Sequence, residues 1–77
     1  MGSETTIKGH LYEEWPGLVA VILRAEQVLV WWRLEQESSN LYRFLAWDGT
    51  DVWMIEDETL ERIVTKVYDR LEDYDGR

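Results

Sequence analysis

The sequence predicts an α+β domain, in which an antiparallel sheet of about five strands is followed by one C-terminal amphipathic helix. Three observations support this fold class. β-Branched and aromatic residues are frequent from residue 18 to residue 55. Asp48-Gly49, a strong hairpin signal, lies between two apolar runs. Apolar residues recur at helical spacing most clearly after residue 59.

A chain of 77 residues forms one small domain, residues 1–77, with a single core. It has no Cys, so neither disulfides nor thiolate metal sites can stabilise it. Its five Trp, four Tyr and one Phe must therefore supply much of the buried surface. Residues 1–4 are polar, and we expect them to form a disordered leader.

The first strand is expected from Thr5 to Trp15, because apolar and polar residues alternate there. Ile7, Leu11 and Trp15 share one phase of this alternation. Pro16-Gly17 then marks a turn.

The apolar centre, residues 18–34, can be interpreted in two ways. A helix that begins at Pro16 would have one apolar face. That face would contain Leu18, Val21, Ile22, Ala25, Val28, Leu29 and Trp32. The remaining apolar residues would make such a helix hydrophobic all round, which a small domain cannot bury. We therefore predict two strands, Leu18–Arg24 and Val28–Glu35, joined by a short polar turn.

The rest of the chain predicts a hairpin and a helix. Leu41–Trp47 is expected to be a strand, with its return strand at Asp51–Ile55. The helix is expected to follow, with Asp57 as its N-cap and Asp75-Gly76 as its stop. Its apolar stripe contains Leu60, Ile63, Val64, Val67, Leu71 and Tyr74.

One helix about 25 Å long can cover only one face of this sheet. The central strands are apolar on both phases, so the second face must also be covered. Either the sheet curls into a small barrel, or a second copy or another partner packs there.

Side chains with catalytic potential are few and scattered. His10 is the sole histidine, and Ser3, Ser38 and Ser39 lie in the predicted leader and turn, so no nucleophile and base are expected to meet. Asp48, Asp51, Glu56 and Asp57 have no calcium-loop spacing, and turn formation and helix capping account for them. We predict no enzyme activity, no cofactor and no metal.

The net charge is −8, which argues against direct binding to nucleic acid or to an anionic membrane. No apolar run is long enough to cross a bilayer, and the first residues lack a signal-peptide pattern, so a cytoplasmic protein is expected. Residues 48–77 contain ten acids and four bases. This asymmetry predicts an acidic surface that attracts a basic partner.

The predicted function is therefore non-enzymatic binding of another macromolecule, a protein with a basic surface. Its sharper form is an inhibitor that mimics nucleic acid, of the kind found in phages and mobile elements. The alternative is a structural homo-oligomer, such as a homodimer, that packs through an apolar sheet face. The predicted partner-binding residues are Asp48, Asp51, Glu56, Asp57, Glu58, Glu61, Glu72, Asp73, Trp31, Tyr42 and Trp53. The three aromatic residues are expected on the phase of the sheet that faces away from the helix, where one or two of them would be interface anchors.

Overall fold

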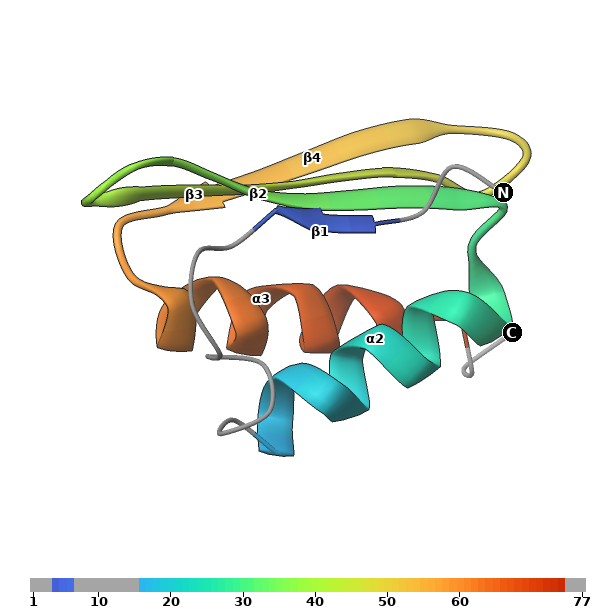
Figure 1. The fold of residues 1–77 in the computed structure, drawn as a ribbon. Coiled ribbons are helices and arrows are strands. Elements are labelled where there is room, and N and C mark those ends of the chain that lie inside the picture. Colours follow the sequence, from blue (N-terminus) through green and yellow to red (C-terminus); the bar gives the residue numbers. More distant parts are fainter. Residues whose placement is uncertain (1–3, 7–15, 75–77) are drawn as a thin grey trace.

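The computed structural model describes residues 4–6 and 16–74. Two neighbouring helices cover one face of a four-stranded sheet (Figure 1). The elements in chain order are β1 (Glu4–Thr6), α2 (Pro16–Val28), β2 (Trp31–Ser38), β3 (Leu41–Trp47), β4 (Val52–Asp57) and α3 (Leu60–Glu72). The α+β class and the antiparallel pairing of β2, β3 and β4 are as predicted. The described residues form four strands and two helices, where five strands and one helix were predicted.

The largest correction concerns the apolar centre. The predicted strand Leu18–Arg24 lies inside helix α2, and the predicted strand Val28–Glu35 is replaced by β2, which begins at Trp31. Glu26, in the last turns of α2, accepts a hydrogen bond from the indole N–H of Trp32 across this connection. The helix that begins at Pro16, which we considered and set aside, is the one that forms.

The burial of α2 explains this outcome. Leu18, Val21 and Ala25 follow one another at helical spacing and are almost completely buried. On the other side of the helix, Val19 and Leu23 keep 38% and 61% of their surface exposed. A helix with an apolar composition thus needs only one buried face, because isolated exposed aliphatic side chains are common on proteins. Packing of that face outweighs the β-propensity of the segment.

The predicted strand Thr5–Trp15 can be compared with the structure only at its start. Glu4–Thr6 forms β1, which pairs in parallel with β2, Glu4 lying opposite Arg33. Residues 7–15 lie outside the described residues, as do residues 1–3 of the predicted leader, whereas Glu4 belongs to the sheet. Parallel neighbours need a crossover connection, and α2 lies within it.

Strand β3 and the turn that follows it are present as predicted. Strand Leu41–Trp47 is confirmed, and the Asp48-Gly49 turn joins it to β4. Gly49 has a positive φ of 98°, a conformation that glycine adopts without steric cost. The return strand runs from Val52 to Asp57, two residues beyond the predicted end.

Helix α3 was predicted correctly, but its N-cap was not. Thr59 caps it, accepting a hydrogen bond at its side-chain oxygen from the backbone N–H of Arg62 (3.2 Å). The predicted cap, Asp57, is the last residue of β4 and has another role described below. The helix ends at Glu72, and the predicted stop at Asp75-Gly76 lies outside the described residues.

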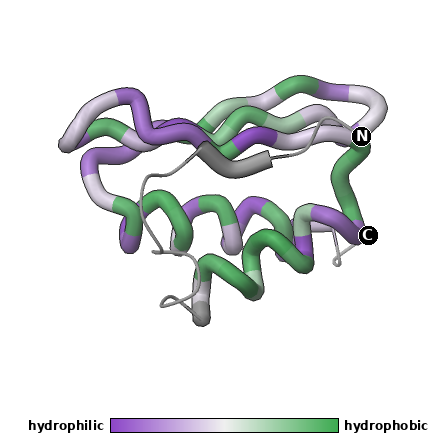
Figure 2. Tube along the Cα trace, in the orientation of Figure 1, coloured by the Kyte–Doolittle hydropathy of each residue, from purple (hydrophilic) through white to green (hydrophobic). Residues whose placement is uncertain are grey.

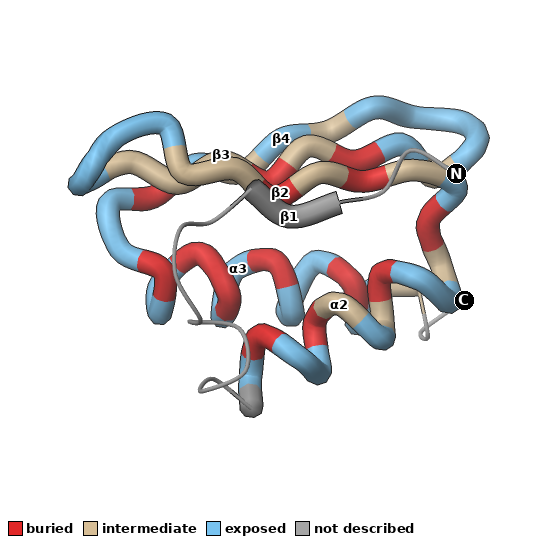
Figure 3. Tube along the Cα trace, viewed as in Figure 1, coloured by how far each residue is buried: buried red, intermediate tan, exposed pale blue. Residues whose placement is uncertain are grey.

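The core lies between the helices and the inner face of the sheet. Figure 2 shows that α2 is hydrophobic along most of its length, whereas Figure 3 shows that buried positions of both helices and of β2 and β3 form one layer. Across the three antiparallel strands, the rings of Trp32, Phe44 and Trp53 form a row. Their centroids are 5.9 Å apart between Trp32 and Phe44, and 5.6 Å apart between Phe44 and Trp53.

The sheet stays open. β1 and β4 stand at its two ends, and both helices lie on the same face, so the barrel that we considered does not form (Figure 1). Both helices leave the opposite face of the sheet uncovered. This open face carries the candidate site.

A proline substitution distinguishes the observed helix from the predicted hairpin. Arg24→Pro removes a backbone donor and introduces a clash in the middle of α2, so we expect a loss of about 3 kcal/mol or more in unfolding free energy. Arg24→Ala, the matched control, removes the side chain that bonds Gln27 but keeps the backbone donor and the helical geometry, so it should cost far less. Urea unfolding followed by circular dichroism measures both. Equal stability of the two variants would contradict the helix.

Candidate binding surface on the open face of the sheet

The strand register decides which side chains line the open face. Trp31 lies opposite Trp47, and Trp47 lies opposite Val52. Leu45 lies opposite Met54. Directly paired residues project to the same side of a sheet, so these five side chains form one cluster, which we call the outer patch. Trp47, Val52 and Met54 keep 41%, 69% and 50% of their surface exposed.

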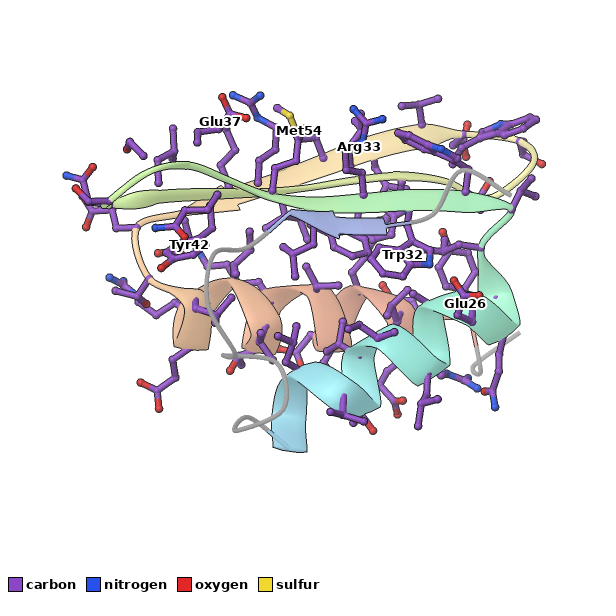
Figure 4. The ribbon with its side chains drawn as sticks, viewed as in Figure 1. Glu26, Trp32, Arg33, Glu37, Tyr42 and Met54 are labelled. Carbon is purple, nitrogen blue, oxygen red and sulfur yellow. The ribbon has the colours of Figure 1, made fainter. Side chains whose placement is uncertain are left out.

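The other end of the open face is ionic. The guanidinium of Arg43 pairs with Glu56 at 2.8 Å and with Glu37 at 3.5 Å, and hydrogen bonding to Glu56 raises the pKa of Arg43. Arg33 lies between the two ends, 5.4 Å from the ring centroid of Trp31 and 3.5 Å from Glu35. Figure 4 shows Arg33, Glu37 and Met54 on this side of the sheet. The face therefore has an apolar end and an end where opposite charges alternate.

The structure corrects the orientation of two predicted aromatic residues. Trp31 does lie on the open face, as predicted. Tyr42 and Trp53 project to the helix side, where both pack against the core (Figure 4 labels Tyr42). The reason is that Tyr42 shares its phase with the buried Phe44, and that Trp53 pairs with the buried Ala46. Their predicted role in partner binding is not tested by this orientation.

The predicted acidic residues fall into two groups at opposite ends of α3. Asp48 and Asp51 flank the β3–β4 turn near the helix C-terminus, where Glu72 and Asp73 lie. Glu56, Asp57, Glu58 and Glu61 surround the β4–α3 connection. Bases accompany the second group, because Arg62 and Lys66 both contact Asp57. The structure thus does not bring the eight acids together on one surface.

Asp48 has a structural role. Its carboxylate accepts hydrogen bonds from the backbone N–H groups of Thr50 and Asp51, both at 2.8 Å, and from the hydroxyl of Tyr74 at 2.7 Å. That hydroxyl in turn accepts a hydrogen bond from the indole N–H of Trp53 at 2.9 Å. The Asp51 amide first, then Tyr74 and the Thr50 amide, lower the pKa of Asp48 from 3.8 to about 2. Burial and the neighbouring carboxylate raise the pKa of Tyr74.

Asp57 is the one buried acid among the described residues. Its carboxylate lies 2.6 Å from the ammonium group of Lys66 and accepts a hydrogen bond from the Glu58 amide at 2.6 Å. The hydrogen bond with Lys66 is the main cause that lowers the pKa of Asp57. Asp57 therefore fixes the end of β4 to the second turn of α3.

Sequence reasoning missed most of the outer patch. Leu45, Trp47, Val52 and Met54 were assigned to strands but not to a binding surface. The signal that could have found them is the Asp48-Gly49 turn, which pairs Trp47 with Val52 and Leu45 with Met54 once its register is applied.

An apolar depression lies between the two helices. It has a volume of about 260 Å³ and is lined by Gly17, Ala20, Val64, Thr65, Tyr68 and Asp69. Asp69 is the only carboxylate in this lining.

Within residues 4–6 and 16–74, no three side chains of His, Cys, Asp or Glu meet in a way that could hold a metal ion. No helix in this part of the chain is long and apolar enough to span a membrane.

The hydrogen bonds of Asp48 predict a pH-dependent stability. A carboxyl group whose pKa is lowered on folding stabilises the protein above its ordinary pKa, and this contribution is lost as the pH falls from about 5 to about 2. Asp48→Asn should therefore destabilise the protein at pH 6, and the difference from wild type should shrink at low pH. Thermal unfolding between pH 2 and pH 6 measures this.

Asp51→Asn is the control, because it neutralises an exposed carboxylate at the other end of the same turn. A stability difference between wild type and Asp48→Asn that stays constant across this pH range would contradict the assignment.

The chain matches no protein-family model, no curated protein and no solved structure.

Proposed function

We propose that this protein is a non-enzymatic binding module that binds another protein through the open face of its sheet. The observation that carries the proposal is the outer patch, in which two tryptophans and three aliphatic or thioether side chains lie together on a face that neither helix covers. Contiguous apolar surface of this kind is typical of interaction sites, and Trp is enriched among the residues that dominate binding energy.

The charges support a partner with a basic surface. The net charge of −8 would attract such a partner at long range, and the ionic end of the open face offers Glu35, Glu37 and Glu56 beside the outer patch. Electrostatic attraction of this kind raises association rates more than affinity. We therefore propose that the outer patch supplies most of the binding free energy and that the acidic residues increase the association rate.

The sharper prediction, imitation of nucleic acid, has less support. A mimic needs an array of unpaired acids on one surface, whereas Asp57 is buried against Lys66 and Asp48 is hydrogen-bonded within the hairpin. Because these two carboxylates stabilise the fold itself, a structural role is favoured for them over a catalytic one.

The alternative of a homo-oligomer is supported by the outer patch. However, two copies that each carry a net charge of −8 repel one another.

Two matched double variants test the proposal. Trp47→Ser with Val52→Thr removes exposed apolar surface from the outer patch, whereas Val19→Ser with Leu23→Ser removes it from the exposed side of α2. A protein captured from an extract of the source cell by the wild type, and then purified, should bind the first variant at least about tenfold more weakly. It should bind the second variant as it binds the wild type.

Unfolding curves establish that both variants fold. Equal binding by all three proteins, or loss of binding only in the α2 variant, would contradict the proposal. A dimer in analytical ultracentrifugation that the outer-patch variant abolishes would favour the homo-oligomer instead.

A further inference from the structure

Strand β4 is an edge strand whose first four residues lack the usual protections against pairing. It is last in the sheet order, and no other described strand pairs with its outer side. Natural edge strands are commonly blocked by a Lys or Pro, a bulge or short length. β4 is six residues long, contains neither Lys nor Pro, and pairs with β3 in an unbroken register. Its first four residues, Val52 to Ile55, are all apolar.

The hydrogen-bonding phase of the hairpin identifies the backbone groups on this edge. The Asp48 amide donates to the Asp51 carbonyl at the turn (3.1 Å), and hydrogen-bonded positions alternate along an antiparallel pair. Positions 53, 55 and 57 therefore direct their backbone groups toward β3. Val52, Met54 and Glu56 direct theirs outward, where another strand can accept and donate.

We propose that β4 binds an extended segment of a partner protein as an added strand, apolar in its middle and with Lys or Arg at its ends. This deepens the proposed function, on which it rests: the added strand would extend the outer patch, because its side chains would lie beside the exposed Val52 and Met54.

Charge complementarity selects this occupant. The exposed Asp51 comes immediately before β4, and Glu56 and the exposed Glu58 lie at its other end. Cationic ends on the incoming strand would face these carboxylates, and opposite charges on neighbouring strands are stabilising. A second copy would instead bring the same acids alongside one another. In the antiparallel register that places Met54 opposite Met54, the exposed Asp51 of one copy would lie beside the end of the other copy's β4 that carries Glu56 and Glu58, and like charges on neighbouring strands are destabilising.

The test uses two synthetic peptides and the whole chain. The first peptide has alternating valine and threonine between two terminal lysines, and the second has glutamates in place of the lysines. We expect the lysine peptide to bind and to slow hydrogen exchange of the Val52 and Met54 amides, as measured by NMR. The glutamate peptide should bind at least about fivefold more weakly. Added salt should weaken the binding of the lysine peptide.

Met54→Pro is the diagnostic variant. It removes an outward-facing N–H without removing a hydrogen bond to β3, so the hairpin should persist while the peptide no longer binds. Met54→Thr removes the same outer-patch side chain but keeps the N–H, so it should bind the peptide clearly more strongly than Met54→Pro, and the difference between the two variants isolates the backbone N–H. Unfolding curves of both variants establish that they fold. If Met54→Pro does not fold, a lysine peptide N-methylated at the amides that would face β4 replaces it, and this peptide should not bind.

Several results would overturn the inference. These are equal binding of the two peptides, binding without protection of Val52 and Met54, and no binding at millimolar peptide. Protection of this edge in the absence of peptide, together with a dimeric mass, would assign it to a second copy. A captured partner that depends on the outer patch but binds Met54→Pro as well as Met54→Thr would overturn the edge inference alone. If the captured partner binds the outer-patch variant as well as it binds wild type, the proposed function is overturned instead.

Discussion

The fold depends on one row of aromatic rings. Trp32, Phe44 and Trp53 stack across β2, β3 and β4 on the side of the sheet that faces the helices, with Phe44 almost completely buried at the centre. This row sets the phase of all three strands, because a shift of one residue would move every side chain to the opposite face. It thereby places the Trp31, Trp47 and Met54 side chains outside. The composition of the inner core and that of the outer patch therefore both follow from the same strand register.

The sequence predicted the parts of the fold that local chemistry determines. The Asp48-Gly49 turn, strand Leu41–Trp47 and the stripe of α3 each depend on spacing within a few residues. The segment from Leu18 to Arg24 could not be assigned in this way, because its aliphatic residues fit a strand by propensity and a helix by periodicity. Its packing against α3 decides between them, and that contact joins residues far apart in the chain.

The candidate site shows the same limit. Both phases of β3 are apolar, with Tyr42, Phe44 and Ala46 on one side and Leu41, Leu45 and Trp47 on the other, so composition does not reveal which side the helices cover. The acidic residues were predicted as one surface from their number. Their separation follows from the length of α3, which carries one group at each of its ends, and from the use of Asp48 and Asp57 in hydrogen bonds within the fold.

The parallel pairing of β1 has a consequence for the order in which the chain assembles. The β2–β3 and β3–β4 hairpins join neighbours in sequence, whereas Glu4 meets Arg33 only after the intervening segment has closed into a loop of about 30 residues. Loop-closure entropy favours the short connections, so the antiparallel strands gain their partners early in folding and β1 gains its partner late. In any state in which β1 has not docked, β2 is an edge as open as β4, and the sheet exposes two strand edges to other chains.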